Sequence, residues 1–82
     1  MEKEIGKIIH YYDKAGVGVL ELSDSLAAGD AIKIKKGEQE FEQTVESMQV
    51  DHENVETAKS GDVVGLKLNG KTKEGAIVYK IE

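Results

Sequence analysis

Six short segments of this 82-residue chain alternate apolar with polar residues or are rich in β-branched and aromatic residues. In chain order they are residues 5–12, 17–22, 31–36, 41–50, 63–68 and 76–81. Turns separate them, and no long segment shows the three- and four-residue spacing of an amphipathic helix. Such strands are typical of an all-β barrel or sandwich. We predict a small closed six-stranded β-barrel, because so small an open sheet would leave two edges exposed to aggregation.

The alternation also predicts which side chains fill the core. In AIKIKK, Ile32 and Ile34 alternate with Lys33 and Lys35, so one face of the strand is buried and the other faces water. The segment 63–68 places Val64, Leu66 and Leu68 on one side in the same way. These apolar residues are therefore predicted to point into the barrel.

The segment FEQTVESMQV, residues 41–50, changes its pattern partway along. Phe41 and Val45 share one parity, whereas Met48 and Val50 share the other, which predicts a bulge or bend in the strand. The polar stretch that follows, residues 51–60, is interpreted as a loop held to the core by Val55.

Size and composition indicate one domain over residues 1–82, in which we expect residues 1–4 to be flexible. The chain has no cysteine and no apolar run as long as a signal peptide or a membrane span. We therefore expect a cytoplasmic protein that does not bind membranes. The net charge of −5, from 16 acidic and 11 basic residues, repels phosphates and argues against DNA binding.

Two Gly-Asp pairs, Gly29-Asp30 and Gly61-Asp62, each precede a strand segment. Glycine tolerates positive φ, and an aspartate carboxylate can accept a hydrogen bond from a nearby backbone N–H. A phosphate-binding loop needs more glycines and a lysine followed by serine or threonine at the start of a helix. We therefore interpret these residues as structural corners, and we predict no nucleotide or other cofactor.

The chain lacks the usual constellations of a catalytic or metal site. Neither His10 nor His52 has a second histidine, a cysteine or a paired carboxylate at ligand spacing, so no metal site is predicted. No serine lies in a nucleophile elbow, and the many carboxylates form no recognisable acid and base pair. We expect a protein that is not an enzyme and has no catalytic residues.

One basic stripe could bind RNA. Lys33, Lys35 and Lys36 follow one another on a single strand, Lys67 on another strand could extend the stripe, and Tyr11 or Tyr12 could stack on bases. The alternative is that these lysines form only the solvated face of a strand. The residue pattern leaves both interpretations open.

Residues 45–68, VESMQVDHENVETAKSGDVVGLKL, resemble the second domain of translational GTPases of the elongation factor Tu and elongation factor 1-alpha group. The upstream run GVGVLELSDSLAAGDAIKI is similar to the same domain. The chain is also similar to the C-terminal barrel of U32-type peptidases. The matching residues in the downstream run are Val45, Ser47, His52, Glu53, Val55, Glu56, Ala58, Gly61, Asp62, Val64 and Gly65.

The resemblance implies a closed barrel that binds rather than catalyses. In the translation factors this domain contacts tRNA, ribosomal RNA or other domains of the factor. The resemblance therefore suggests binding of tRNA, ribosomal RNA or a component of the translation or RNA-modification machinery, with Gln49, His52 and Glu56 as binding residues beside Lys33 and Lys35. The alternative is a protein-interaction module that docks onto a separately encoded protein partner such as a U32-type peptidase.

Overall fold

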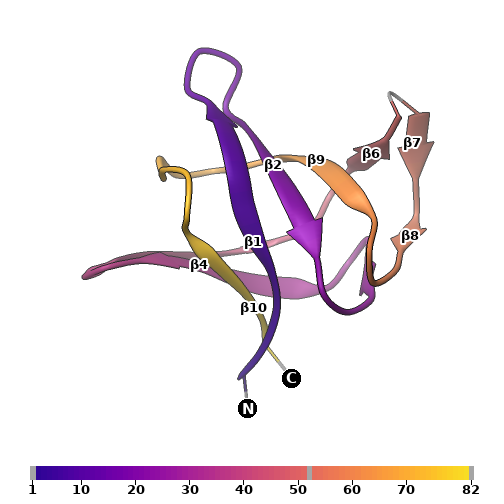
Figure 1. Ribbon diagram of the computed structural model, residues 1–82, viewed down its shortest axis with the longest axis horizontal. Coiled ribbons are helices and arrows are strands. Elements are labelled where there is room, and N and C mark those ends of the chain that lie inside the picture. The colour runs from indigo at the N-terminus through magenta and orange to yellow at the C-terminus, as the bar shows by residue number, and fades with distance from the viewer. Residues whose placement is uncertain (1, 52, 82) are drawn as a thin grey trace.

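The computed structural model describes residues 2–51 and 53–81, which form strands, turns and loops (Figure 1). Within these residues no helix is long and apolar enough to cross a membrane. The strands are β1 (Glu2–Tyr12), β2 (Val17–Leu22), β3 (Leu26–Ala27), β4 (Ala31–Lys36), β5 (Gln39–Thr44), β6 (Met48–Val50), β7 (Glu53–Val55), β8 (Thr57–Ala58), β9 (Val63–Lys67) and β10 (Ile77–Ile81). The predicted all-β class is confirmed.

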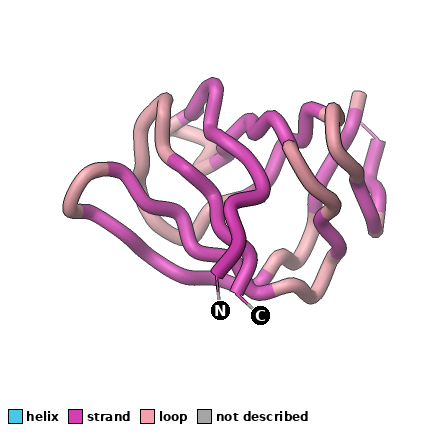
Figure 2. The backbone as a smooth tube through the Cα atoms, turned by 60° about the horizontal axis from the view of Figure 1, so that its bottom comes forward, coloured by secondary structure: helices cyan, strands magenta, loops and turns pink. Residues whose placement is uncertain are grey.

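Eight of the strands form one antiparallel sheet in the order β5-β4-β10-β1-β2-β9-β6-β7, and β3 pairs with β8 in a separate ribbon. The sheet curls around the core, and β1 runs beside β10, so the two ends of the described chain lie together (Figures 1 and 2). In the described residues, no strand pairing joins β5 to β7. The expected closed six-stranded barrel is therefore not what the strand pairing shows.

The additional strands arise where the sequence predicted one long strand followed by a loop. The change of parity predicted for residues 41–50 is confirmed, because the chain bends between β5 and β6 at residues 45–47. Val45 stays buried at this bend, where its N–H and C=O bond to Asp30 and Gly29. The predicted loop 51–60 instead contains β7, which forms a hairpin with β6, and β8, which pairs with β3.

The core is built from the inward-facing positions of the curled sheet. Ile32 and Ile34 on β4 are buried as predicted, as are Val64, Leu66 and Leu68. Burying each such side chain contributes about 1.5–3 kcal/mol relative to leaving it in water. The buried apolar residues are Ile5, Ile8, Leu20, Leu22, Leu26, Ile32, Ile34, Val45, Met48, Ala58, Val64, Leu66, Leu68, Ala76 and Val78.

A glutamine side chain links the edge strand β5 to the far side of the sheet. The Gln43 side-chain amide nitrogen donates to the carbonyl of Lys67 at 2.8 Å, and its oxygen accepts from the N–H of Asn69 at 2.7 Å. Gln43 is 9% exposed. One side chain thus satisfies two backbone groups, as a paired strand would, and it ties β5 to the end of β9.

Three corners of the chain form the same turn. Gly29, Gly61 and Gly75 have φ values of 94°, 92° and 91°, and in each turn the N–H of the next residue donates to the carbonyl three residues before it. At the first two corners, the carboxylates of Asp30 and Asp62 also accept the N–H of Ala27 and Lys59. Glycine is needed here because side chains rarely adopt this backbone conformation.

We expect Asp62→Ala to lower the free energy of unfolding by about 1 kcal/mol, because the Lys59 N–H loses its carboxylate partner. Asp62→Asn keeps a side-chain oxygen that can accept this bond, so it should cost less. Urea unfolding followed by far-UV circular dichroism measures both. Equal losses for the two variants would show that the negative charge, rather than the hydrogen bond, stabilises this corner.

The N-terminal segment differs from the expectation of a flexible end. Residues 2–4 pair with Tyr79–Ile81 in β10, while residue 1 lies outside the described residues. Two ion pairs hold this end of β1 against neighbouring segments of the chain: Lys33 pairs with Glu2, and Lys3 pairs with Asp24.

The Lys3 ion pair has a defined dependence on pH. The hydrogen bond from Lys3, together with one from the backbone N–H of Ser25, holds the pKa of Asp24 below its ordinary value of 3.8. Since the folded-state pKa is the lower one, the contribution of Asp24 to stability is present above pH 3.8. It is lost as the pH falls through the folded-state value.

Candidate functional site

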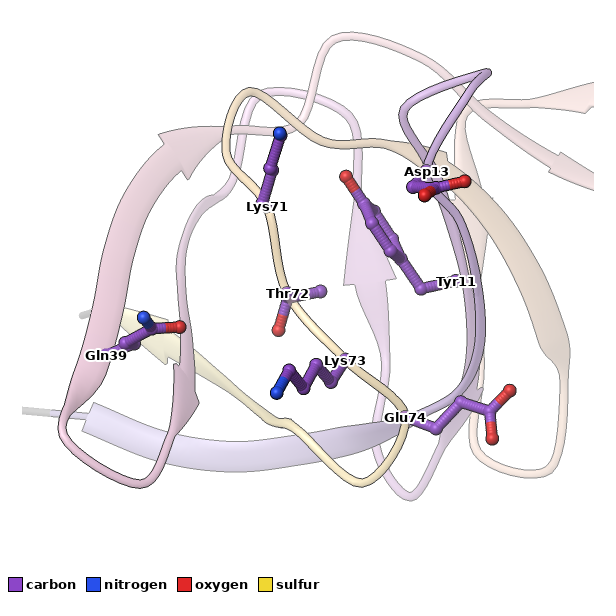
Figure 3. A pocket seen from close by; sticks show the side chains of 7 residues that line it. All are labelled: Tyr11, Asp13, Gln39, Lys71, Thr72, Lys73 and Glu74. Atoms are coloured by element: carbon purple, nitrogen blue, oxygen red, sulfur yellow. The ribbon is translucent and has the colours of Figure 1, made fainter.

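A cleft of about 740 Å³ opens at one end of the sheet. Its lining residues are Tyr11, Asp13, Gln39, Lys71, Thr72, Lys73 and Glu74. In the view of Figure 3, the segment 71–74 crosses between Gln39, at the start of β5, and Tyr11, near the end of β1.

The fold positions this cleft through a glycine contact and a turn. A Cβ atom on Gly70 would lie 3.0 Å from the ring of Phe41, so any side chain at residue 70 would require the ring to shift, and glycine lets the loop pack closely against β5. The loop then ends in the Gly75 turn, where the backbones of Gly75 and Ala76 bond to Ile8 on β1. These contacts fix segment 71–74 between two strands.

The lining of the cleft carries both signs of charge. Lys71 and Lys73 are basic, whereas Asp13 and Glu74 are acidic. The carboxylate of Glu74 lies 3.0 Å from His10 Nδ1. This lining can bind polar groups, but its described residues include no serine or cysteine nucleophile. In the described part of the chain, no three acidic, histidine or cysteine side chains are grouped closely enough to hold a metal ion.

A second surface is the outward side of β1, β2, β9, β6 and β7, which we call the outer face. Cross-strand pairing places His10 beside Val19, Val19 beside Gly65, Gly65 beside Gln49, and Gln49 beside Asn54. One row of outward positions thus runs across five strands. The Gln49 side-chain amide donates to the Asn54 side-chain oxygen at 3.1 Å.

The outer face is apolar near its middle and has a hollow there. Tyr12 pairs with Val17 in the neighbouring row, and the rings of His10 and Tyr12 meet edge to face with centroids 4.2 Å apart. A hollow of about 130 Å³ lies beside Gly65 and is lined by Val17, Ser47, Met48, Gln49, Gly65 and Lys67. The surface therefore offers a shallow depression with a mixed lining, in which Val17 and Met48 are apolar and Ser47, Gln49 and Lys67 are polar.

The three binding residues predicted from the translation-factor resemblance do not form one site in the described residues. Gln49 lies on the outer face next to the hollow. Glu56 is exposed between β7 and β8, and its backbone carbonyl accepts the N–H of Ala28. His52 lies outside the described residues. Their use in binding stays a prediction.

The predicted basic stripe is interleaved with carboxylates. Lys33 Nζ lies 2.6 Å from Glu2 and 3.9 Å from Glu40, and the Lys33 side chain is only 15% exposed. The hydrogen bond to Glu2 raises the pKa of Lys33. Lys35 lies directly across from Glu40 in the β4–β5 pair. These lysines therefore form no isolated positive surface, and their role in RNA binding stays a prediction.

Sequence reasoning missed the outer face, although the sequence contains a signal for it. The segment 17–22 carries apolar residues on both parities, because Leu20 fills the core whereas Val19 points outward. Tyr12 has the same parity as Ile8 and points outward only because the β1–β2 register shifts between Ile8 and His10. A strand with apolar residues on both faces buries one face in the core, and its second apolar face stays exposed unless another surface packs on it. That second parity is the signal.

Comparisons with known proteins show which sequences and structures this chain is similar to. No family model matches the chain. It is 42% identical over 80 residues to an uncharacterised protease of Methanocaldococcus jannaschii; the match covers 96% of this chain but spans only 20% of that relative.

The structure matches the crystal structure of the C-terminal domain of a Geobacillus thermoleovorans putative U32 peptidase with a TM-score of 0.91 and 16% identity, covering 98% of this chain and 93% of that one. The selenomethionine variant of the same domain matches with a TM-score of 0.87 and 15% identity, covering 93% and 96%. The likeness to translational GTPases stays a prediction. The chain therefore has the fold of the C-terminal domain of a U32 peptidase.

Proposed function

We propose that this chain is a non-catalytic module that docks onto the body of a U32-type protease. The observation that carries the proposal is the match to the M. jannaschii protease, which includes almost the whole of this chain but only one fifth of the relative. The remaining four fifths of that protein leaves ample room for a catalytic body. The fold shared with a U32 peptidase C-terminal domain supports the same function.

The non-catalytic part of the proposal rests on what the described side chains can do. The cleft joins lysines, carboxylates, a threonine and a tyrosine without a nucleophile next to an orienting base. The His10 imidazole contacts the exposed Glu74 carboxylate, which can orient it, and the Tyr12 ring, but no serine or threonine is bonded to it in the described residues. Binding is the activity that such surfaces support.

RNA binding, the main prediction from sequence, has less support. A protein that binds phosphates needs lysines that can replace the counterions of the nucleic acid. Here Lys33 already has carboxylate partners, and the whole chain carries a net charge of −5. A protein partner with few phosphates avoids this repulsion.

We expect the tagged chain, used as bait in a lysate of its source organism, to recover a U32-type protease with or without RNase treatment. The physical reason is that docking joins two protein surfaces directly, so that removal of RNA does not weaken it. Quantitative mass spectrometry of the eluates measures the recovery. The bait Gly6→Ala serves as the control, because its added Cβ atom would clash with β2 and is expected to unfold much of the protein.

Recovery of translation or RNA-modification proteins that disappears after RNase treatment would favour the RNA-binding alternative. Failure to recover any U32-type protease with a folded bait would contradict the proposed docking.

A further inference from the structure

The exposed apolar side chains of this molecule gather on strands of the outer face. Among the described residues, the large hydrophobic side chains that are exposed are Ile9, Tyr12 and Val63, at 43%, 52% and 44%. Ile9 is the extra residue where the β1–β2 pairing shifts, and Val63 lies across from Glu21 on β2. Tyr12 lies across from Val17 at one end of β2, Val63 lies near its other end, and the half-buried Val17 and Val19 share the outward side of β2 with them. Single exposed apolar residues need no explanation, but several on one sheet face favour an interaction site.

Gly65, in the middle of the outer face, is not required by the packing of the module. A Cβ atom there would meet only Gln49 O at 3.9 Å and Val17 Cγ1 at 4.0 Å, which are ordinary contacts. Its φ is not in the left-handed region. A glycine inside a strand weakens the strand, and such a residue often marks the close approach of another backbone or ligand. The missing side chain leaves the hollow lined by Val17 and Gln49.

The β6–β7 hairpin, at the edge of the sheet beside the outer face, is acidic. Glu46, Asp51, Glu53 and Glu56 lie in or beside this hairpin and are exposed. In the described part of the chain, no ion pair reaches these four carboxylates. The segment 37–58 that contains them has no lysine or arginine. Such a rim attracts a basic surface and repels an acidic one.

We propose that the outer face is the surface that docks onto the protease body, with the partner backbone or a partner side chain entering the hollow at Gly65. The proposal rests on the proposed function and adds the chemistry of the partner. That partner surface is apolar at its centre and carries lysine or arginine where it meets the β6–β7 hairpin. A second copy of this chain fits less well, since two chains of net charge −5 would meet.

The test measures binding of purified variants to the protease recovered by the wild-type chain. Gly65→Arg fills the hollow and adds a positive charge, and Tyr12→Ser removes the largest exposed apolar side chain of the face. Each should weaken binding about tenfold or more, the range expected for central interface residues. The control Thr44→Arg adds the same side chain to an exposed position on β5, at the opposite end of the sheet, and should bind as the wild type does.

A matched pair tests the acidic rim. Glu53→Lys on β7 should weaken binding and reduce its sensitivity to salt, whereas Glu38→Lys, the same change in the β4–β5 turn, should do neither. Thermal unfolding of every variant verifies that the fold is intact. Because Gly65 has open space around it, Gly65→Arg should melt at or above the wild-type temperature while binding less.

The outcomes separate the two proposals. Loss of binding by Gly65→Arg and Tyr12→Ser with intact folds supports the inference. If both bind as the wild type does, the outer face is not the docking surface, although the docking function stands. If the wild-type chain recovers no U32-type protease, both proposals are overturned. A wild-type dimer that Gly65→Arg converts to a monomer would replace the protease by a second copy as the occupant.

Discussion

Gly6→Ala is expected to lower the free energy of unfolding by about 3 kcal/mol, enough to unfold much of the protein at 25 °C. A Cβ atom at residue 6 would lie 2.5 Å from Leu20 Cδ1 and 2.7 Å from the backbone oxygen of Glu21. The Leu20 methyl group can move, but the oxygen belongs to β2, whose residue Glu21 pairs with Lys7. Overpacking a core costs about 1–3 kcal/mol and sometimes more, and so small a core supplies only about 3–5 kcal/mol.

Gly65→Ala is the matched control for this prediction, since both glycines lie inside strands of the same sheet. The free energy of unfolding should change by less than about 0.5 kcal/mol, or rise, because alanine replaces a glycine where space is open. Urea unfolding monitored by far-UV circular dichroism measures both variants. Wild-type stability of Gly6→Ala would mean that β1 and β2 lie farther apart than the structure describes.

Gln43→Leu is expected to cost about 2 kcal/mol. Leucine has a similar volume but leaves the Lys67 carbonyl and the Asn69 N–H without their partner, and each lost hydrogen bond costs about 0.5–1.5 kcal/mol. The loss should be local as well as global. Hydrogen exchange of the Asn69 amide should speed up more than that of amides in the β1–β2 pair.

Gln39→Leu is the control for Gln43→Leu. Gln39 lies on the same strand and the same parity but is exposed, so its replacement should change the free energy of unfolding by less than about 0.5 kcal/mol. If the two variants have equal stability, the Gln43 side chain does not hold β5 to the end of β9, and the sheet is open at that point in solution.

Much of the fold was predictable because strand patterning is local. Ile32 and Ile34 alternate with lysines, and this alternation alone places the isoleucines in the core, where they are fully or almost fully buried. The bend between β5 and β6 was predictable too, because Val45 and Met48 differ in parity and yet both must be buried. In each case the burial pattern depends only on residues that lie a few positions apart in the chain.

The number and closure of the strands were not predictable in the same way. The short strands β7 and β8 exist because Val55 lies across from Met48 and Ala58 across from Leu26, and neither segment shows a clear alternation by itself. Short polar segments become strands only when a partner edge is available to satisfy their backbone groups. In the residues that the structure describes, ten strands are therefore observed where six were expected.

The candidate site was less predictable than the fold. Lys33 looked like part of a solvated basic stripe, but Glu2, 31 residues away in sequence, is its hydrogen-bond partner. Whether a charge is free or paired depends on side chains that the fold brings together from distant segments. Separation along the chain does not predict distance in space, so the ion pairs of the lysine stripe could be identified only from the structure.

By itself, the sequence determined the all-β class, the inward-facing core residues and the glycine turns, because side-chain alternation and backbone freedom are properties of a few adjacent residues. Only the tertiary structure decided that Gln43 reaches the end of β9, 24 residues away, and that Gly65 has open space above it. Both facts depend on which strands become neighbours. The same glycine in an isolated strand would carry no information about a partner.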